Sequence, residues 1–181
     1  MKKKVKIKLT FIDNTPESGN DNAAPLADSE ADISEYVTEA EYVEGERCDL
    51  IYKENAELGM GDCVIKITWL REDPQIVTVI RSGEVETVMT FEPGRRHISV
   101  YNMKEMSFEL CSRAMKCKNT FDGEAGGEIY VDYIVEIRGG FAGRRKMRVE
   151  VIPNNQKFPD RKINKSPTVG HNKCAVESDF L

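Results

Sequence analysis

Hydrophobic and polar residues alternate with a period of two along most of the chain, a pattern typical of half-buried β-strands. In residues 4–12, for example, Val5, Ile7, Leu9 and Phe11 would lie on one face and the lysines on the other. The same alternation recurs between turns rich in Gly, Pro and Asp. It predicts strands at 4–12, 33–43, 47–54, 63–71, 75–81, 84–91, 96–102, 106–116, 129–137 and 147–151. No amphipathic helix longer than two turns is expected.

Consecutive strands with short connections favour antiparallel, up-and-down pairing. An open sheet of this size would expose two long edges to other chains, and closure into a barrel removes both of them. The sequence therefore predicts an all-β fold: a single antiparallel up-and-down barrel of about eight to ten strands. We expect this barrel to form one domain at residues 1–152.

Two segments lack the alternation. Residues 13–32 are rich in Asn, Asp, Ser and Pro, and they cannot bury enough apolar surface to offset the entropy lost on ordering. They are predicted to form a flexible acidic loop within the barrel domain. Residues 153–181 are polar and aperiodic, and are predicted to be a disordered C-terminal tail.

The hairpin formed by residues 75–91 decides which of its side chains face the interior. If Ser82 and Gly83 form a two-residue loop, Thr78 pairs with Thr87 on the core face. Arg81 then lies on the opposite face. A β-bulge would invert this arrangement and place the guanidinium inside, where it could bind a carboxylate or phosphate.

Charge is unevenly distributed along the 181 residues. The formal net charge is −5, yet residues 1–12 carry +5, 13–46 carry −11, 47–152 carry −1 and 153–181 carry +2. The bulk acidity therefore says little about the partners of the barrel. The longest apolar runs are far shorter than the roughly 20 residues that a membrane span needs, so no membrane association is expected.

Cysteine and histidine restrict the possible chemistry. The five cysteines are irregularly spaced, and no export signal precedes them, which predicts reduced thiols and a cytoplasmic protein. With two histidines and no CxxC pair, no metal site is expected. No phosphate-binding loop, nucleophile elbow, zinc-protease or dinucleotide motif occurs, so neither catalytic residues nor a cofactor are predicted.

Two binding functions remain. The first is a barrel that holds a small apolar or anionic ligand, for which the candidate side chains are Arg81, Thr78, Thr87, Ser112 and Tyr133. The same side chains would equally suit a filled core with hydrogen-bonded hydroxyls. The second is a nucleic-acid or protein interface on the basic hairpin at residues 138–148. A lone Arg-Gly-Gly sequence is a weak signal, and a hairpin turn flanked by solvated charges explains this basic run, so nucleic acid is not expected as a partner. The oligomeric state is left open.

Several short motifs, in order, resemble those of the YwiB-like family of uncharacterised bacterial proteins. They are Val37–Glu39, Ile51–Glu54, Thr78–Gly83, Phe91–His97 with Tyr101, and Gly127–Tyr133. The resemblance covers roughly residues 1–152. It implies a barrel similar to the calycins, which include lipocalins and fatty-acid-binding proteins. Since the function of the family is unassigned, the resemblance supplies no catalytic residue.

Overall fold

The computed structural model describes residues 1–15, 31–54, 62–123 and 125–152, and β-strands form its framework. The predicted tail at 153–181 and residues 16–30 of the predicted acidic loop lie outside the described residues. The strands are β1 (Lys2–Asp13), β2 (Asp32–Val43), β3 (Arg47–Lys53), β4 (Cys63–Leu70), β5 (Val77–Gly83), β6 (Val85–Phe91), β7 (Arg96–Met103), β8 (Met106–Asn119), β9 (Glu128–Ile137) and β10 (Gly140–Ile152). The first nine strands each begin within about two residues of the predicted position, whereas β10 begins at Gly140, seven residues before the predicted start at 147.

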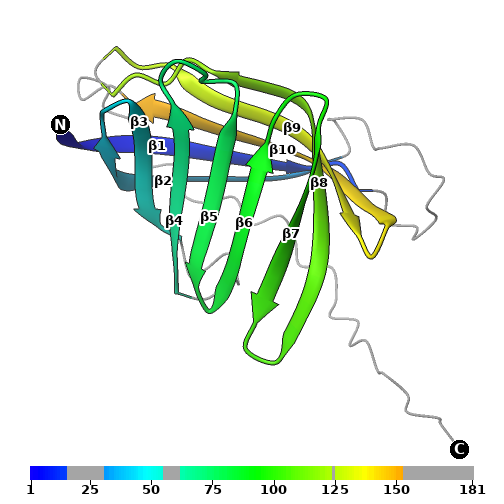
Figure 1. The fold of residues 1–181 in the computed structure, drawn as a ribbon. Coiled ribbons are helices and arrows are strands. Elements are labelled where there is room, and N and C mark those ends of the chain that lie inside the picture. Colours follow the sequence, from blue (N-terminus) through cyan, green and yellow to red (C-terminus); the bar gives the residue numbers. More distant parts are fainter. Residues whose placement is uncertain (16–30, 55–61, 124, 153–181) are drawn as a thin grey trace, which may run out of the picture.

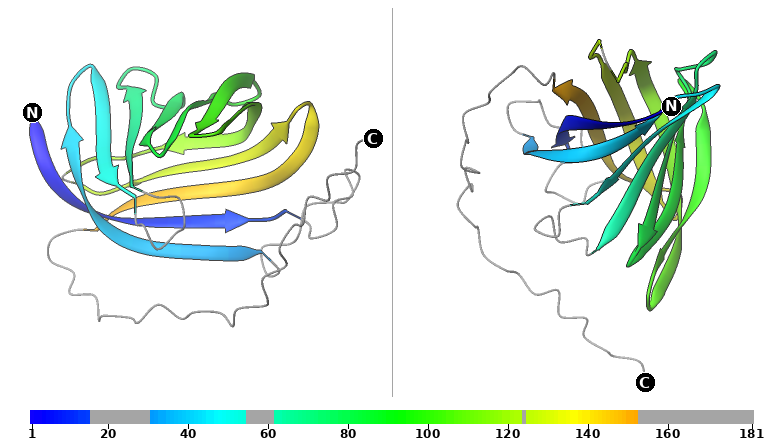
Figure 2. Two further views of the ribbon diagram at one scale, coloured as in Figure 1. Left: turned by 90° about the horizontal axis from the view of Figure 1, so that it is seen from below. Right: turned by 90° about the vertical axis from the view of Figure 1, so that its left-hand side faces the viewer.

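The strands close into a barrel. Neighbours in sequence pair antiparallel throughout, and β1 completes the ring because it pairs with β2 along one side and with β10 along the other. The strands β4, β5 and β6 pass in front of β1, β2 and β10, which cross behind them at a steep angle (Figure 1). Long strands β1, β2 and β10 curve strongly around the interior (Figure 2). The prediction of an all-β, antiparallel, up-and-down barrel is confirmed.

The opposite charges of the first two strands meet across their shared edge. Lys2 Nζ lies 2.8 Å from Glu41 Oε1, and Lys8 Nζ lies 2.8 Å from Glu35 Oε1. Such exposed pairs contribute little to stability, because solvent and salt screen them. The lysines of residues 1–12 and the acidic residues of β2 therefore largely screen one another.

One end of the barrel interior is filled by aromatic side chains. The ring centroids of Tyr42 and Trp69 are 6.1 Å apart, and Phe121 packs against both at 5.4 and 5.7 Å. Leu50 and Ile67, both fully buried, continue this packing toward the middle of the barrel. This end is a conventional core.

The register of the β5–β6 hairpin differs from the predicted one. Arg81 pairs with Thr87, and Thr78 pairs with Thr90 rather than with Thr87. Five residues lie between Arg81 and Thr87, the last pair of the two strands. Beyond Arg81, β5 no longer pairs with β6 but still pairs with β4, with Gly83 opposite Cys63. This odd-numbered connection reverses the face of β5, so Arg81 points inward and Thr78 outward. The prediction of a two-residue loop was wrong for this reason.

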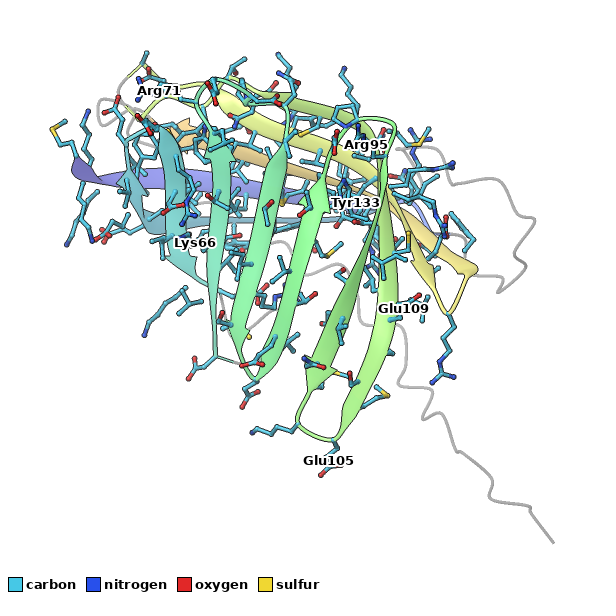
Figure 3. The ribbon with its side chains drawn as sticks, viewed as in Figure 1. Lys66, Arg71, Arg95, Glu105, Glu109 and Tyr133 are labelled. Atoms are coloured by element: carbon cyan, nitrogen blue, oxygen red, sulfur yellow. The ribbon has the colours of Figure 1, made fainter. Side chains whose placement is uncertain are left out.

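The β7–β8 hairpin extends beyond the rest of the barrel, with Glu105 at its tip (Figure 3). β7 pairs with β8 along its whole length, but with β6 only at residues 101–103. Within the described residues, no helix is long and apolar enough to cross a membrane. Nor does any group of three or more His, Cys, Asp or Glu side chains in that part of the chain converge as a metal site would.

Candidate functional site

The other end of the interior is hollow. A cavity of about 410 Å³ lies there, and every one of the ten strands contributes at least one lining residue. Its volume falls within the range of about 300–1,000 Å³ that is usual for ligand sites. Its wall is mainly apolar, with side chains that include Phe11, Ile65, Val79, Phe91, Val135 and Met147. We call this space the lumen.

An ion pair stands in the wall of the lumen. Arg81 Nη2 donates to Glu54 Oε1 at 2.7 Å, and the two side chains are only 18% and 6% exposed. Arg81 Nη1 is 3.5 Å from the hydroxyl of Tyr101. Glu54 directly follows β3, and its backbone N–H donates to the Cys63 carbonyl at 2.9 Å, which extends the β3–β4 pairing. Burying two charges carries a desolvation cost, so a well-packed apolar pair would stabilise the barrel as well or better.

Tyrosine hydroxyls add neutral polar groups to the lumen. Burial raises the pKa of Tyr133, whose ring centroid is 4.6 Å from that of Phe91. Burial, the neighbouring Tyr36 hydroxyl and the Glu54 carboxylate together hold the pKa of Tyr52 well above its usual value. Both phenols therefore stay protonated at neutral pH. The Tyr52 hydroxyl is hydrogen-bonded to that of Tyr36, whereas the Tyr133 hydroxyl can donate to a ligand.

Two polar atoms of the lumen wall are buried without a hydrogen-bond partner among the described residues. They are Glu54 Oε2 and Thr87 Oγ1. Buried polar groups are normally paired, and each unpaired one costs about 1–3 kcal/mol. Both residues line the lumen, so these two atoms are positioned to bind a ligand.

The Thr87 hydroxyl gives a first testable prediction. We expect Thr87→Val to keep or increase the free energy of unfolding, by up to about 1 kcal/mol, because it replaces an unpaired hydroxyl with a methyl group of the same shape. Thr78→Val is the matched control. It should lower the free energy of unfolding by about 1 kcal/mol, because Thr78 Oγ1 is hydrogen-bonded to Thr90 Oγ1 at 3.2 Å. Urea denaturation measures both, and a loss above 1 kcal/mol for Thr87→Val would show that its hydroxyl is paired.

The charges that line the lumen balance one another. The described lining residues include three carboxylates and three cations, namely Asp13, Asp32, Glu54, Arg81, Arg145 and Lys146. Arg145 Nε donates to Asp13 Oδ2 at 3.0 Å. Although burial alone would raise it, the pKa of Asp13 is lowered by hydrogen bonds from Thr15 and by Arg145. The lumen is therefore polar at its rim without a net positive charge.

The structure brings together three of the five side chains that the sequence singled out. Arg81, Thr87 and Tyr133 line the lumen, whereas Thr78 and Ser112 do not. Thr78 lies on the outer face because of the changed register. Ser112 is buried, and its Oγ donates to the Thr90 carbonyl at 3.2 Å, so its hydroxyl links β8 to β6.

Sequence reasoning missed Glu54, Tyr52 and Tyr101. The first two could have been found, because alternation along β3 puts Cys48, Leu50, Tyr52 and Glu54 on a single face. Tyr101 needed the three-dimensional structure, since it lies where β7 leaves β6.

The basic hairpin at residues 138–148 is extensively paired with carboxylates. Arg144 binds Asp132 with two hydrogen bonds of 2.9 and 2.7 Å. Arg148 Nε lies 3.3 Å from Glu128 Oε2, and its guanidinium also lies over the ring of Tyr130. A phosphate backbone would have to displace these partners, which lowers the charge that the hairpin offers to nucleic acid.

Comparison with known proteins supports the fold. A family model described as Domain of unknown function (DUF1934) matches residues 25–149. The crystal structure of the ywiB protein from Bacillus subtilis superimposes with a TM-score of 0.60 and 21% sequence identity, covering 82% of this chain and 91% of that one. No match was found among curated proteins.

Proposed function

Because the chain belongs to the DUF1934 family, which brings no activity with it, we propose from the geometry of the lumen that the barrel binds a small, largely apolar molecule. The observation that carries this proposal is the 410 Å³ cavity, which contrasts with the packed aromatic side chains of Tyr42, Trp69 and Phe121 at the opposite end of the same barrel. A barrel that served only as a scaffold would gain stability by filling this space, since packed interiors leave few voids larger than a water molecule.

An apolar ligand suits the lumen better than a simple anion does. The wall is mainly apolar, and both Arg81 and Arg145 already face a carboxylate at 2.7 and 3.0 Å. Binding at a nucleic-acid interface is supported less well, because three arginines of the basic hairpin are paired with carboxylates: Arg144 with Asp132, Arg145 with Asp13 and Arg148 with Glu128.

The described cysteines, Cys48, Cys63, Cys111 and Cys117, are buried and form no disulfide. Buried thiols that stay reduced fit a reducing compartment. A cytoplasmic ligand carrier is therefore the form of the proposal that we favour.

A neutral fluorescent probe tests the proposal. N-phenyl-1-naphthylamine emits strongly in apolar surroundings, and we expect the wild-type protein to bind it saturably. Val79→Phe, which fills the lumen, should weaken this binding on the order of tenfold or more. The matched control is Val88→Phe on the same hairpin, because Val88 is exposed on the outer face and its enlargement leaves the lumen unchanged.

Two results would contradict the proposal. The first is wild-type protein that leaves the emission of the probe unchanged. The second is an equal loss in Val79→Phe and Val88→Phe, which would place the probe outside the lumen.

A further inference from the structure

We propose that the lumen selects a neutral ligand that carries an N–H or O–H donor, such as an amide or an alcohol, and discriminates against a carboxylate of the same length. This inference rests on the proposed function and adds the chemical class of the ligand. It follows from the Arg81–Glu54 ion pair, the unpaired oxygens of Glu54 and Thr87 in the lumen wall, and the neutral hydroxyl of Tyr133.

The first step concerns charge. A ligand carboxylate that approached Arg81 would share its guanidinium with Glu54, whose Oε1 is 2.7 Å from Nη2. Two carboxylates on one cation in a mostly buried site repel each other, because little water is present to screen them. The charge of Arg81 is therefore already matched by the Glu54 carboxylate, and a ligand avoids the penalty if it carries no charge.

The second step concerns hydrogen bonding. Glu54 Oε2 lines the lumen, belongs to a side chain that is 6% exposed, and has no partner among the described residues. A carboxylate oxygen only accepts hydrogen bonds, so the ligand must supply the donor. Thr87 Oγ1, likewise unpaired, lies on the residue directly across from Arg81 in the β5–β6 pairing. One unpaired oxygen thus belongs to the carboxylate that binds Arg81, and the other belongs to the residue that pairs with Arg81 across the β5–β6 ladder.

The third step concerns the acceptor of the ligand. Tyr133 lines the lumen from β9, lies close enough to Arg81 for its charge to act on the phenol, and keeps its proton because burial raises its pKa. Its hydroxyl can donate to a carbonyl or hydroxyl oxygen of the ligand. An amide or an alcohol offers both a donor for Glu54 and an acceptor for a tyrosine, whereas an ester offers an acceptor alone.

Displacement of N-phenyl-1-naphthylamine from the wild-type protein at pH 7.5 tests this selectivity. The competitors are decanamide, methyl decanoate and ionised decanoate, which share one chain length. We expect decanamide to bind about tenfold or more tightly than either of the others, since a hydrogen bond to a charged group is worth that much. Decanoate that binds as tightly as decanamide would overturn the inference.

A charge-neutralising variant should reverse the preference. Glu54→Gln removes the Glu54 carboxylate from Arg81, so we expect decanoate to gain about tenfold in affinity relative to decanamide. The matched control is Glu84→Gln in the connection between β5 and β6. It removes a carboxylate from an exposed ion pair with Lys104 and should leave the preference unchanged. An unchanged preference in Glu54→Gln would overturn the inference.

A second variant covers the case in which Glu54→Gln does not fold. The double substitution Arg81→Met with Glu54→Leu removes both charges, and it should bind all three competitors with affinities that follow their apolar surface alone. Retained selectivity for decanamide would overturn the role of this pair. If the wild-type protein did not bind the probe at all, the proposed function would fail together with the inference. If it bound the probe and preferred decanoate, the inference alone would fail.

Discussion

Glu54→Leu is expected to lower the free energy of unfolding by about 3 kcal/mol, because it removes the Glu54 carboxylate from a largely buried guanidinium, that of Arg81 in the lumen wall. Both side chains are largely buried, so solvent compensates little for the lost partner. The double variant Arg81→Met with Glu54→Leu should recover to within about 1 kcal/mol of the wild type, since replacing a whole buried pair with apolar side chains is often neutral or stabilising. Urea denaturation of the single and double variants measures both values.

The control for this pair is Glu84→Leu, which breaks an ion pair whose two side chains are 52% and 78% exposed. Its cost should stay below about 1 kcal/mol. If the double variant remained as unstable as Glu54→Leu, the ion pair itself would stabilise the barrel. Its presence would then be explained by stability and would not support ligand binding.

Alternation of residues was enough to predict the strands and their closure. Each strand has one face against the interior, so apolar and polar residues alternate with a period of two in segments such as β1 and β9. The same signal fails wherever an extra residue enters a strand. The bulge between Ala114 and Lys116 in β8 and the connection at Gly83 each reverse the inward face, and neither changes the composition of its segment.

The lumen could not be predicted from the sequence for a different reason. Whether a barrel interior is filled depends on which large side chains meet across it. Tyr42, Trp69 and Phe121 come from distant parts of the chain and fill one end. At the other end Val79, Val135 and Thr87 are too short to reach across, and this contrast becomes visible only once the register of every pair is known.

Gly83→Ala should be among the most damaging single substitutions in the barrel. Its φ of 145° is a conformation that residues with a side chain rarely adopt, and an added Cβ would lie 2.2 Å from the Asp62 carbonyl oxygen. The backbone strain and the overlap together should lower the free energy of unfolding by about 3 kcal/mol or more. Urea denaturation tests this, with Gly94→Ala as the matched control at the other end of β6.

Comparison with Gly94→Ala separates the cost of backbone strain from the cost of steric overlap. The φ of Gly94 is 77°, and an added Cβ would meet nothing within 4 Å, so Gly94→Ala should cost only about 1–2 kcal/mol from the backbone conformation. Gly83→Ala should also weaken binding of N-phenyl-1-naphthylamine in whatever fraction folds, since the connection at Gly83 sets the face on which Arg81 lies. Equal costs for the two glycines would mean that β5 can shift away from Asp62. The inward position of Arg81 would then be maintained by its bond to Glu54 rather than imposed by the backbone.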